Sequence, residues 1–227
     1  MLRQSRDERT LKQNLMLASL TAFAAGVINV AALVSFLAVT ADISIGGHMA
    51  KLANHMVQQN FEEIAIFFLW LLLFFVGAFA SSFTVKSWGN KNTYRAQAIP
   101  IVLEIVVLLF VAVYGNHFEL ETRIQREIVV SCTVFALGLQ TGLVAIVSGG
   151  LIKSSSLASL FTDLGGECAE YFHVGTKKDK EIRKRIFIRL TVLGFYMLGG
   201  AIGGFLFDQY EFAVFYFIPV ILLLILL

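Results

Sequence analysis

Long apolar runs alternate with short polar segments along the chain. A helix needs about 20 apolar residues to cross roughly 30 Å of hydrocarbon, because it rises about 1.5 Å per residue. Six runs approach or exceed this length, so the pattern predicts an all-α, polytopic membrane protein with six transmembrane helices. The last run is short for a span, which leaves open whether the printed chain stops inside that helix. The runs cover residues 15–40, 64–85, 96–114, 128–152, 186–207 and 212–227.

The two halves of the chain carry an internal repeat. A shift of 112 residues aligns "SLTAFAAG" (19–26) with "SCTVFALG" (131–138) at five of eight positions, and it gives eight identities over 40 positions. The only two prolines fall at matching places, in "IPIVLE" of the third run and "IPVILL" of the sixth. The second and fifth runs both pass into a patch of small residues, "FFVGAFASSF" and "YMLGGAIGGF". We therefore predict two repeats of three helices each.

An odd number of helices per repeat makes the second copy enter the membrane from the opposite side. The copies are then related by inversion, an architecture common among secondary transporters. A polar segment follows the first helix of each copy, residues 40–61 and 150–172, and we expect both segments to be re-entrant or interfacial. The predicted organisation is an N-terminal segment (1–14), a first repeat (15–114), an external loop (115–127) and a second repeat (128–227).

The distribution of basic residues predicts the orientation. If the N-terminus is cytoplasmic, the inside segments hold 15 of the 18 Lys and Arg residues. This positive-inside bias predicts cytoplasmic N- and C-termini in a bacterial cytoplasmic membrane. The formal net charge of +2 reports topology and gives no reason to expect nucleic-acid binding. We expect the basic segment 177–189 to lie against anionic lipid headgroups, with Arg189 snorkelling from the end of its span.

Glu104 is a lone carboxylate four positions after Pro100 in the middle of the third run. A charged side chain at bilayer depth costs at least about 2.5 kcal/mol on insertion scales, so it should be neutral, paired or facing water. Glu104 could therefore bind a cation or a proton. The alternative is a protonated carboxyl that only hydrogen-bonds a neighbouring helix.

Amides and hydroxyls mark the first and fourth runs. Asn29 lies in the first, Gln140 and Thr141 lie in the fourth, and the repeat register pairs Asn29 with Thr141. Polar side chains in lipid need partners, and hydrogen bonds between helices supply them. These residues therefore either hold helices together or line a site near the axis that relates the two repeats.

The outer polar segment contains Gly47 and His48, which we count as candidate solute contacts. His48 and His55 lie at helical spacing with Asp42 nearby, but spacing fixes no third ligand, so we predict no metal site. A polar face toward solvent or headgroups is the alternative reading.

The inner polar segment offers three further candidate contacts, Ser156, Thr162 and Asp163. Serine and threonine can cap a short helix that starts at depth, and the free amides of a helix N-terminus attract anions. The alternative is an interfacial helix that ends at the glycine pair 165–166.

Small residues recur at intervals of four in several runs, which puts them on one helix face and lets two backbones approach closely. We expect these faces to be packing surfaces, or alternatively a dimer face. They comprise Ala18, Ala22 and Gly26, then Gly77 and Ser81, then Gly199 with Gly203 and Gly200 with Gly204.

Three short motifs carry a family resemblance: "GGHMAKLA" (46–53), "ALGLQT" (136–141) and "ASLFTDLG" (158–165). With them the chain resembles the YoaK-like family of uncharacterised bacterial six-helix membrane proteins, although His48 stands where the family has Asn. The resemblance implies a six-helix fold and a membrane location, and it implies no particular activity or substrate.

Recognisable enzyme motifs and cysteine clusters do not occur in the sequence, so we expect no catalysis and no cofactor. We expect a small-solute transporter or channel-like protein, working as a homodimer, in which the inverted halves rock around the polar residues. The alternative is a membrane scaffold or assembly factor in which the same residues only hold helices together.

Overall fold

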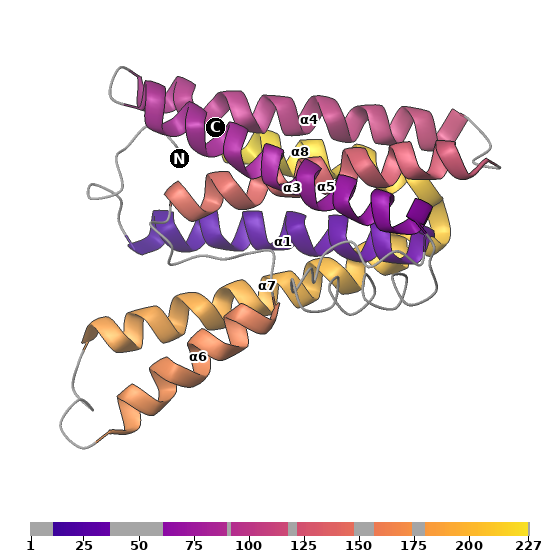
Figure 1. Ribbon diagram of the computed structural model, residues 1–227. Helices are drawn as coiled ribbons and strands as arrows, with labels where there is room; N and C mark the ends of the chain where they lie inside the picture. The colour runs from indigo at the N-terminus through magenta and orange to yellow at the C-terminus, as the bar shows by residue number, and fades with distance from the viewer. Residues whose placement is uncertain are drawn as a thin grey trace.

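The computed structural model describes residues 11–36, 61–89, 92–117, 122–147, 157–173 and 180–226. All regular structure in these residues is helical (Figure 1). The predicted outer polar segment, residues 40–61, lies outside them except for Phe61. The helices are α1 (Leu11–Phe36), α3 (Phe61–Trp88), α4 (Thr93–His117), α5 (Arg123–Val147), α6 (Leu157–Phe172), α7 (Lys180–Tyr210) and α8 (Val214–Leu226), with the short 3₁₀ helix η2 (Glu211–Ala213) before α8.

Four stretches of the described residues are long and apolar enough to cross a membrane. The longest contains both α7 and α8, and α1 adds a shorter apolar stretch, Ala18–Ala31. The prediction of a polytopic helical membrane protein is therefore confirmed. The four stretches are Ile64–Trp88, Tyr94–His117, Arg123–Ile146 and Lys180–Leu226.

The observed helices extend past the apolar runs that predicted them. α4 continues to His117 and α5 begins at Arg123, so both enter the residues that we expected to form the external loop. α7 begins at Lys180, six residues before its predicted start. A hydropathy pattern marks only the part of a helix that lies in hydrocarbon, whereas the helix itself continues where water and headgroups solvate polar side chains.

α1 and α7 pack with almost no space between their backbones. A Cβ placed on Gly26 of α1 would overlap the carbonyl oxygen of Tyr196 on α7, and a Cβ on Gly199 of α7 would overlap the carbonyl oxygen of Phe23 on α1. Apolar side chains gain little by leaving lipid for a helix surface, so close backbone packing is what holds such a pair together. The predicted packing role of these small residues is confirmed.

α3 and α5 form a second pair of the same kind. A Cβ on Gly77 of α3 would overlap the carbonyl oxygen of Phe135, and a Cβ on Gly138 of α5 would overlap the carbonyl oxygen of Phe74. Both pairs thus depend on glycine at the point of closest approach. They join segments far apart in the sequence, and Figure 1 shows α1 beside α7 and α3 beside α5.

The centre of the bundle is an apolar cluster between the two pairs. It contains the wholly buried side chains of Ile28 from α1, Leu108 from α4, Leu137 from α5 and Phe215 from α8. Two-thirds of the apolar stretch of α5 is buried (67%), against 22% for α3. Of the four stretches, that of α5 is therefore the most deeply buried and that of α3 the most exposed.

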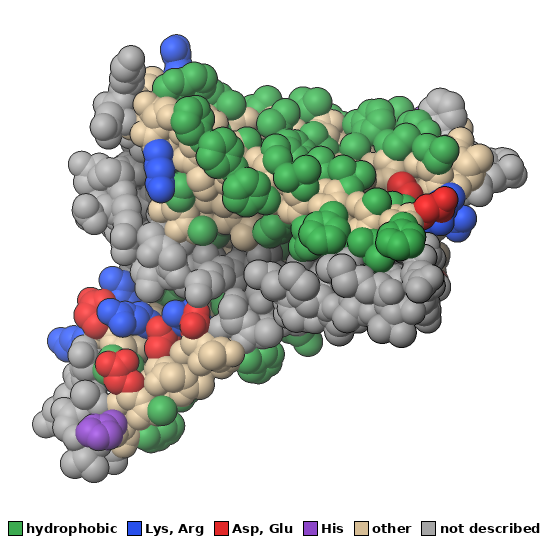
Figure 2. Space-filling model, in the orientation of Figure 1, with side chains coloured by type: hydrophobic (Ala, Val, Ile, Leu, Met, Phe, Trp, Pro, Cys, Tyr) green, Lys and Arg blue, Asp and Glu red, His purple; other side chains and the backbone are tan. Residues whose placement is uncertain are grey.

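The outward face of α3 carries large apolar side chains. Phe75, Phe79 and Phe83 are exposed and stack in sequence, with ring centroids 6.2 and 5.7 Å apart. Figure 2 shows hydrophobic side chains spread over this face of the bundle, with charged side chains gathered toward its ends and on the hairpin below. Such a surface matches hydrocarbon rather than water as its solvent.

α6 and the first part of α7 form a hairpin that diverges from the bundle (Figure 1). The alternative in which the helix ends at the glycine pair is wrong, because α6 continues through Gly165 and Gly166 to Phe172. Near its N-terminal end Leu160 packs against Val192 and Tyr196 of α7 in a small cluster that includes residues of α1. The hairpin is therefore anchored at one end.

Candidate functional site

Glu104 is a carboxyl group inside the apolar core. It lies in the middle of α4, and its side chain is only 1% exposed. Ile101 and Leu108, about one turn away on either side, belong to the central cluster of α1, α4, α5 and α8, so Glu104 faces the same cluster. Its Oε1 atom has no hydrogen-bond partner among the described residues. A buried polar atom without a partner is costly, so this carboxyl is complementary to a proton, a cation or a donor group.

Gln140 lies near the same depth on the neighbouring helix. α4 and α5 follow one another and pack together. Glu104 is 13 residues before the end of α4, and Ala136 is 13 residues after the start of α5. Gln140 lies four residues beyond Ala136, which is about 6 Å along the helix axis. The carboxyl and the amide therefore belong to the same central part of the bundle.

Gln140 connects α5 to α1. Its Nε2 donates a hydrogen bond to the carbonyl oxygen of Thr21 at 3.3 Å. The other amide atom, Oε1, and the hydroxyl of the next residue, Thr141, have no hydrogen-bond partner among the described residues. One half of the Gln140 amide thus holds two helices together, while the other half keeps an unused acceptor.

Asn29 connects α1 to α7 in a similar way. Its Nδ2 donates to the Tyr196 hydroxyl at 2.8 Å, and the side chain is buried. Its Oδ1, like Oε1 of Gln140, has no hydrogen-bond partner in the described part of the chain. The amide is therefore fixed in orientation, because one end is bound and the other faces the interior.

Four predicted site residues thus share one property. Asn29, Glu104, Gln140 and Thr141 each bury an oxygen that no described residue satisfies. All four oxygens can accept a hydrogen bond or contact a positive charge. Each of these buried oxygens therefore has an unused capacity to accept a hydrogen bond or contact a cation.

The predicted site residue Asp163 lies elsewhere, in an ion cluster between α6 and α7. The Nη1 of Arg189 donates to Oδ2 of Asp163 at 2.8 Å, and its Nε forms an ion pair with Oε2 of Glu167 at the same distance. The prediction that Arg189 snorkels to the headgroups is wrong: its side chain is 10% exposed and faces two carboxylates one helical turn apart. Since both acids flank the glycine pair 165–166, the Arg189 contact supports the helix across it.

Of the remaining candidates, only Thr162 is among the described residues. It is exposed on α6. Gly47, His48 and Ser156 lie outside the described residues.

Sequence reasoning missed two residues that hold these side chains. Tyr196 orients Asn29, and Glu167 completes the Arg189 cluster. Each had a signal: Tyr196 is a hydroxyl inside an apolar run, which needs a partner in lipid, and Glu167 lies one turn after Asp163.

Metal-binding side chains do not gather in the part of the chain that the structure describes, where no three His, Cys, Asp or Glu residues meet. Cys132 on α5 and Cys168 on α6 are half-buried free thiols. The polar chemistry of the described bundle therefore rests on amides, hydroxyls and the Glu104 carboxyl.

Comparison with known proteins gives one match. A family model described as "Protein of unknown function (DUF1275)" matches residues 17–227. No curated protein and no solved structure matches the chain. The match is compatible with the resemblance to uncharacterised six-helix membrane proteins. Because it covers nearly the whole chain, this protein belongs to the DUF1275 family of proteins of unknown function.

Proposed function

We propose that the protein is a small-solute transporter or channel-like protein that carries its solute through the interior of the helix bundle. The observation that carries the proposal is Glu104, a wholly buried carboxyl with an unused oxygen in the middle of an apolar bundle. Ionisable groups at bilayer depth are rare and commonly belong to ion or substrate pathways. A purely structural helix would be more stable with an apolar residue at this position.

Inverted repeats support this proposal, and the glycine contacts support the repeat. The shift of 112 residues turns Gly26 into Gly138, and the two small-residue patches align Tyr196 with Phe74. The contact of Gly26 with the Tyr196 carbonyl and that of Gly138 with the Phe74 carbonyl are then one contact made twice.

The reciprocal contacts obey the same rule. Gly199 meets the carbonyl of Phe23, while Gly77 meets the carbonyl of Phe135, and the two phenylalanines are again 112 residues apart. In this arrangement the first helix of each repeat packs on the second helix of the other. Each such pair could move as one rigid unit, which is the element that alternating access requires.

The unpartnered oxygens suggest the class of solute. Asn29, Gln140 and Thr141 add neutral acceptors to the carboxyl of Glu104. A monovalent cation, a protonated amine or a polyol would each supply the missing donors or charge. Among these unpartnered atoms only the Thr141 hydroxyl can also donate to an anion, and the Glu104 carboxylate would repel one, so we propose that the solute is cationic or neutral with several donors. The positive-inside bias puts both termini and α6 on the cytoplasmic side of this path.

The test is flux in proteoliposomes with Glu104→Gln as the key variant. Purified protein is reconstituted with the pH indicator pyranine inside, and proton flux is driven by a potassium gradient with valinomycin. Uptake of radiolabelled sodium, methylamine and glycerol is measured in parallel. We expect the wild-type protein to pass at least one of these and Glu104→Gln to abolish that flux, since the amide keeps the shape and loses the charge. Glu170→Gln, on the exposed face of α6, should keep wild-type flux.

The rival function is a membrane scaffold, for which rigid glycine-packed pairs would serve equally well. If Glu104→Gln remains folded by size-exclusion chromatography and keeps full flux, the site at Glu104 is refuted. If the wild-type protein passes none of the tested solutes above empty vesicles, the scaffold becomes the better account.

A further inference from the structure

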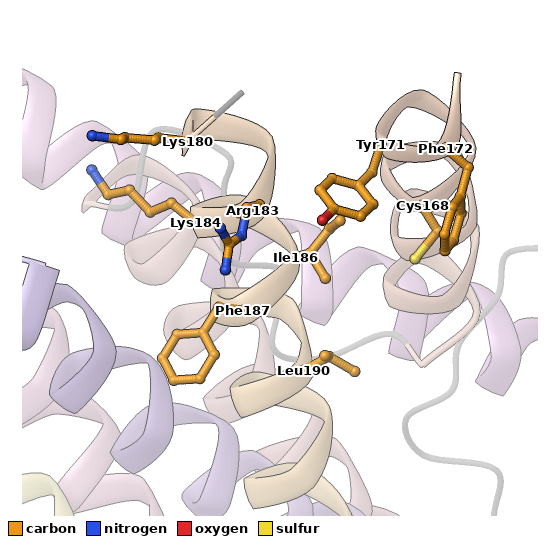
Figure 3. A pocket seen from close by; sticks show the side chains of 9 residues that line it. All are labelled: Cys168, Tyr171, Phe172, Lys180, Arg183, Lys184, Ile186, Phe187 and Leu190. Atoms are coloured by element: carbon orange, nitrogen blue, oxygen red, sulfur yellow. The ribbon is translucent and has the colours of Figure 1, made fainter. Parts of the chain in front are cut away.

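A groove opens between the end of α6 and the beginning of α7, away from the bundle interior (Figure 3). Its volume is about 680 Å³. In Figure 3, Tyr171 points from α6 toward α7, and Cys168 and Phe172 lie beside it on the same helix. The groove exists because the two helices are clamped at Arg189 and diverge beyond it.

The charged side chains that line the groove all carry positive charge. They are Lys180, Arg183 and Lys184, within little more than one turn of α7, and none of the described residues that line the groove is acidic. The two carboxylates of the clamp, Asp163 and Glu167, are occupied by Arg189. In Figure 3 the ammonium groups of Lys180 and Lys184 lie together on the side of α7 away from Tyr171, and the Arg183 guanidinium lies between them and α6. The α7 edge of the groove is therefore complementary to an anion.

The rest of the lining is apolar and exposed. Phe172 is 70% exposed, Phe187 55% and Leu190 49%. A soluble anion would leave these side chains uncovered, whereas an amphiphile would cover them. The same groove thus offers cations at one end of α7 and an apolar surface farther along it.

The groove also lies at the right depth for a lipid. α7 has 31 residues, which is about 46 Å of helix against roughly 30 Å of hydrocarbon. Counting back about 20 residues from Phe207 reaches Ile188. The turns before Ile188, which contain all three cations, then lie among the headgroups, while Leu190 lies where acyl chains begin.

We infer that this groove is a binding site for one acidic glycerophospholipid. The phosphate group contacts Lys180, Arg183 and Lys184, and the acyl chains run along Phe187 and Leu190. This is a defined site between two helices and goes beyond a general attraction of the basic segment to the membrane surface. It is independent of the solute path at Glu104.

Native mass spectrometry of the full chain in detergent tests the site with dioleoyl phosphatidylglycerol as the probe. The key variant is Arg183→Gln with Lys184→Gln. The matched control, Lys86→Gln with Arg185→Gln, removes the same charge from exposed residues that do not line the groove. We expect one tightly retained lipid on the wild-type protein, unchanged in the control and weakened roughly 10- to 30-fold in the groove variant. Dioleoyl phosphatidylcholine should be retained weakly by all three proteins.

Three outcomes would overturn the inference. Equal weakening in both double variants would mean a diffuse electrostatic attraction without a site. Displacement of the lipid by millimolar inorganic phosphate would mean a site for a soluble anion. Equal retention of phosphatidylcholine and phosphatidylglycerol would remove the role of the three cations. All four substituted positions are on the surface, so the variants should fold, and circular dichroism checks this.

Discussion

The pair α1–α7 and the hairpin α6–α7 share a helix but are held together by opposite chemistry. In the bundle, α7 meets α1 through glycines, with no ion pair recorded between the described residues of the two helices. About three turns before Gly199, the same helix meets α6 through Arg189, Asp163 and Glu167. The difference between the two contacts follows from the medium that surrounds each of them. Where lipid surrounds both helices, close backbone contact and the buried hydrogen bond from Asn29 to Tyr196 hold them together, and where water and headgroups begin, ion pairs do so.

This comparison also separates two uses of glycine. Gly199 and Gly26 have another backbone where a Cβ would be, whereas Gly194, Gly165 and Gly166 have no other described residue within 4 Å of that position. The first group is required by packing. In the second group, packing between the described residues does not require glycine.

The largest effect should come from adding one methyl group in the glycine-packed pair. In Gly199→Ala the new Cβ overlaps the Phe23 carbonyl oxygen, so α1 and α7 must separate along their length. Overpacking of a core typically costs 1–3 kcal/mol, and contact with rigid backbone places this case at about 3 kcal/mol or more. The melting temperature of the detergent-solubilised protein, followed by size-exclusion chromatography, should fall sharply.

Gly194→Ala on the same helix is the matched control. It makes the same chemical change where there is open space, and alanine favours helix over glycine by up to about 1 kcal/mol, so the melting temperature should stay level or rise. Equal melting temperatures for the two variants would contradict the close packing of α1 on α7.

Much of the bundle could be predicted from the sequence because hydrophobic length and small-residue spacing act locally. The apolar runs located the helices, and the stripes at Gly26, Gly77 and Gly199 were correctly assigned to packing. The partner of each stripe could not be predicted, because a small-residue face fits any similar face. The continuation of α6 through Gly165 and Gly166 also escaped prediction, since it depends on Arg189 from another helix.

For the candidate site, too, the residues could be found from the sequence and their contacts could not. Asn29, Glu104 and Gln140 could be found from sequence, because a polar side chain in an apolar run is conspicuous. Their fixed orientation could not, because it depends on tertiary contacts such as the Tyr196 hydroxyl. Asp163 was grouped with them on polarity alone, although its carboxylate pairs with Arg189 in the hairpin.

Breaking the ion cluster should have a smaller and more local effect. Arg189→Gln leaves Asp163 and Glu167 one turn apart without their shared cation. Removing one partner from a fully buried pair costs about 3–5 kcal/mol, and the partial exposure here lowers the expected value to about 2 kcal/mol. Amide hydrogen exchange in α6 should accelerate roughly 10- to 30-fold, while the melting temperature of the bundle changes little.

Arg185→Gln is the control for this variant, because Arg185 is exposed on the same helix and makes no recorded ion pair within the described residues. It should leave α6 exchange unchanged. Adding Asp163→Asn and Glu167→Gln to Arg189→Gln should restore part of the protection, since the repulsion between the carboxylates disappears. Unchanged exchange in Arg189→Gln would show that the cluster does not hold the hairpin.

The smallest effect should come from Gly166→Ala in α6, which sharpens the contrast between the two kinds of glycine. Nothing lies within 4 Å of the added Cβ, so only the helix propensity changes, by up to about 1 kcal/mol in favour of the helix. Amide exchange in α6 should therefore slow by up to about fivefold, with no change in the melting temperature of the bundle. Gly203→Ala in α7, where the Cβ would approach the Val27 Cα to 2.7 Å, should instead destabilise the bundle. If Gly166→Ala also destabilised the protein, a surface over the glycine pair would have to be covered by residues outside the described part of the chain or by a second copy.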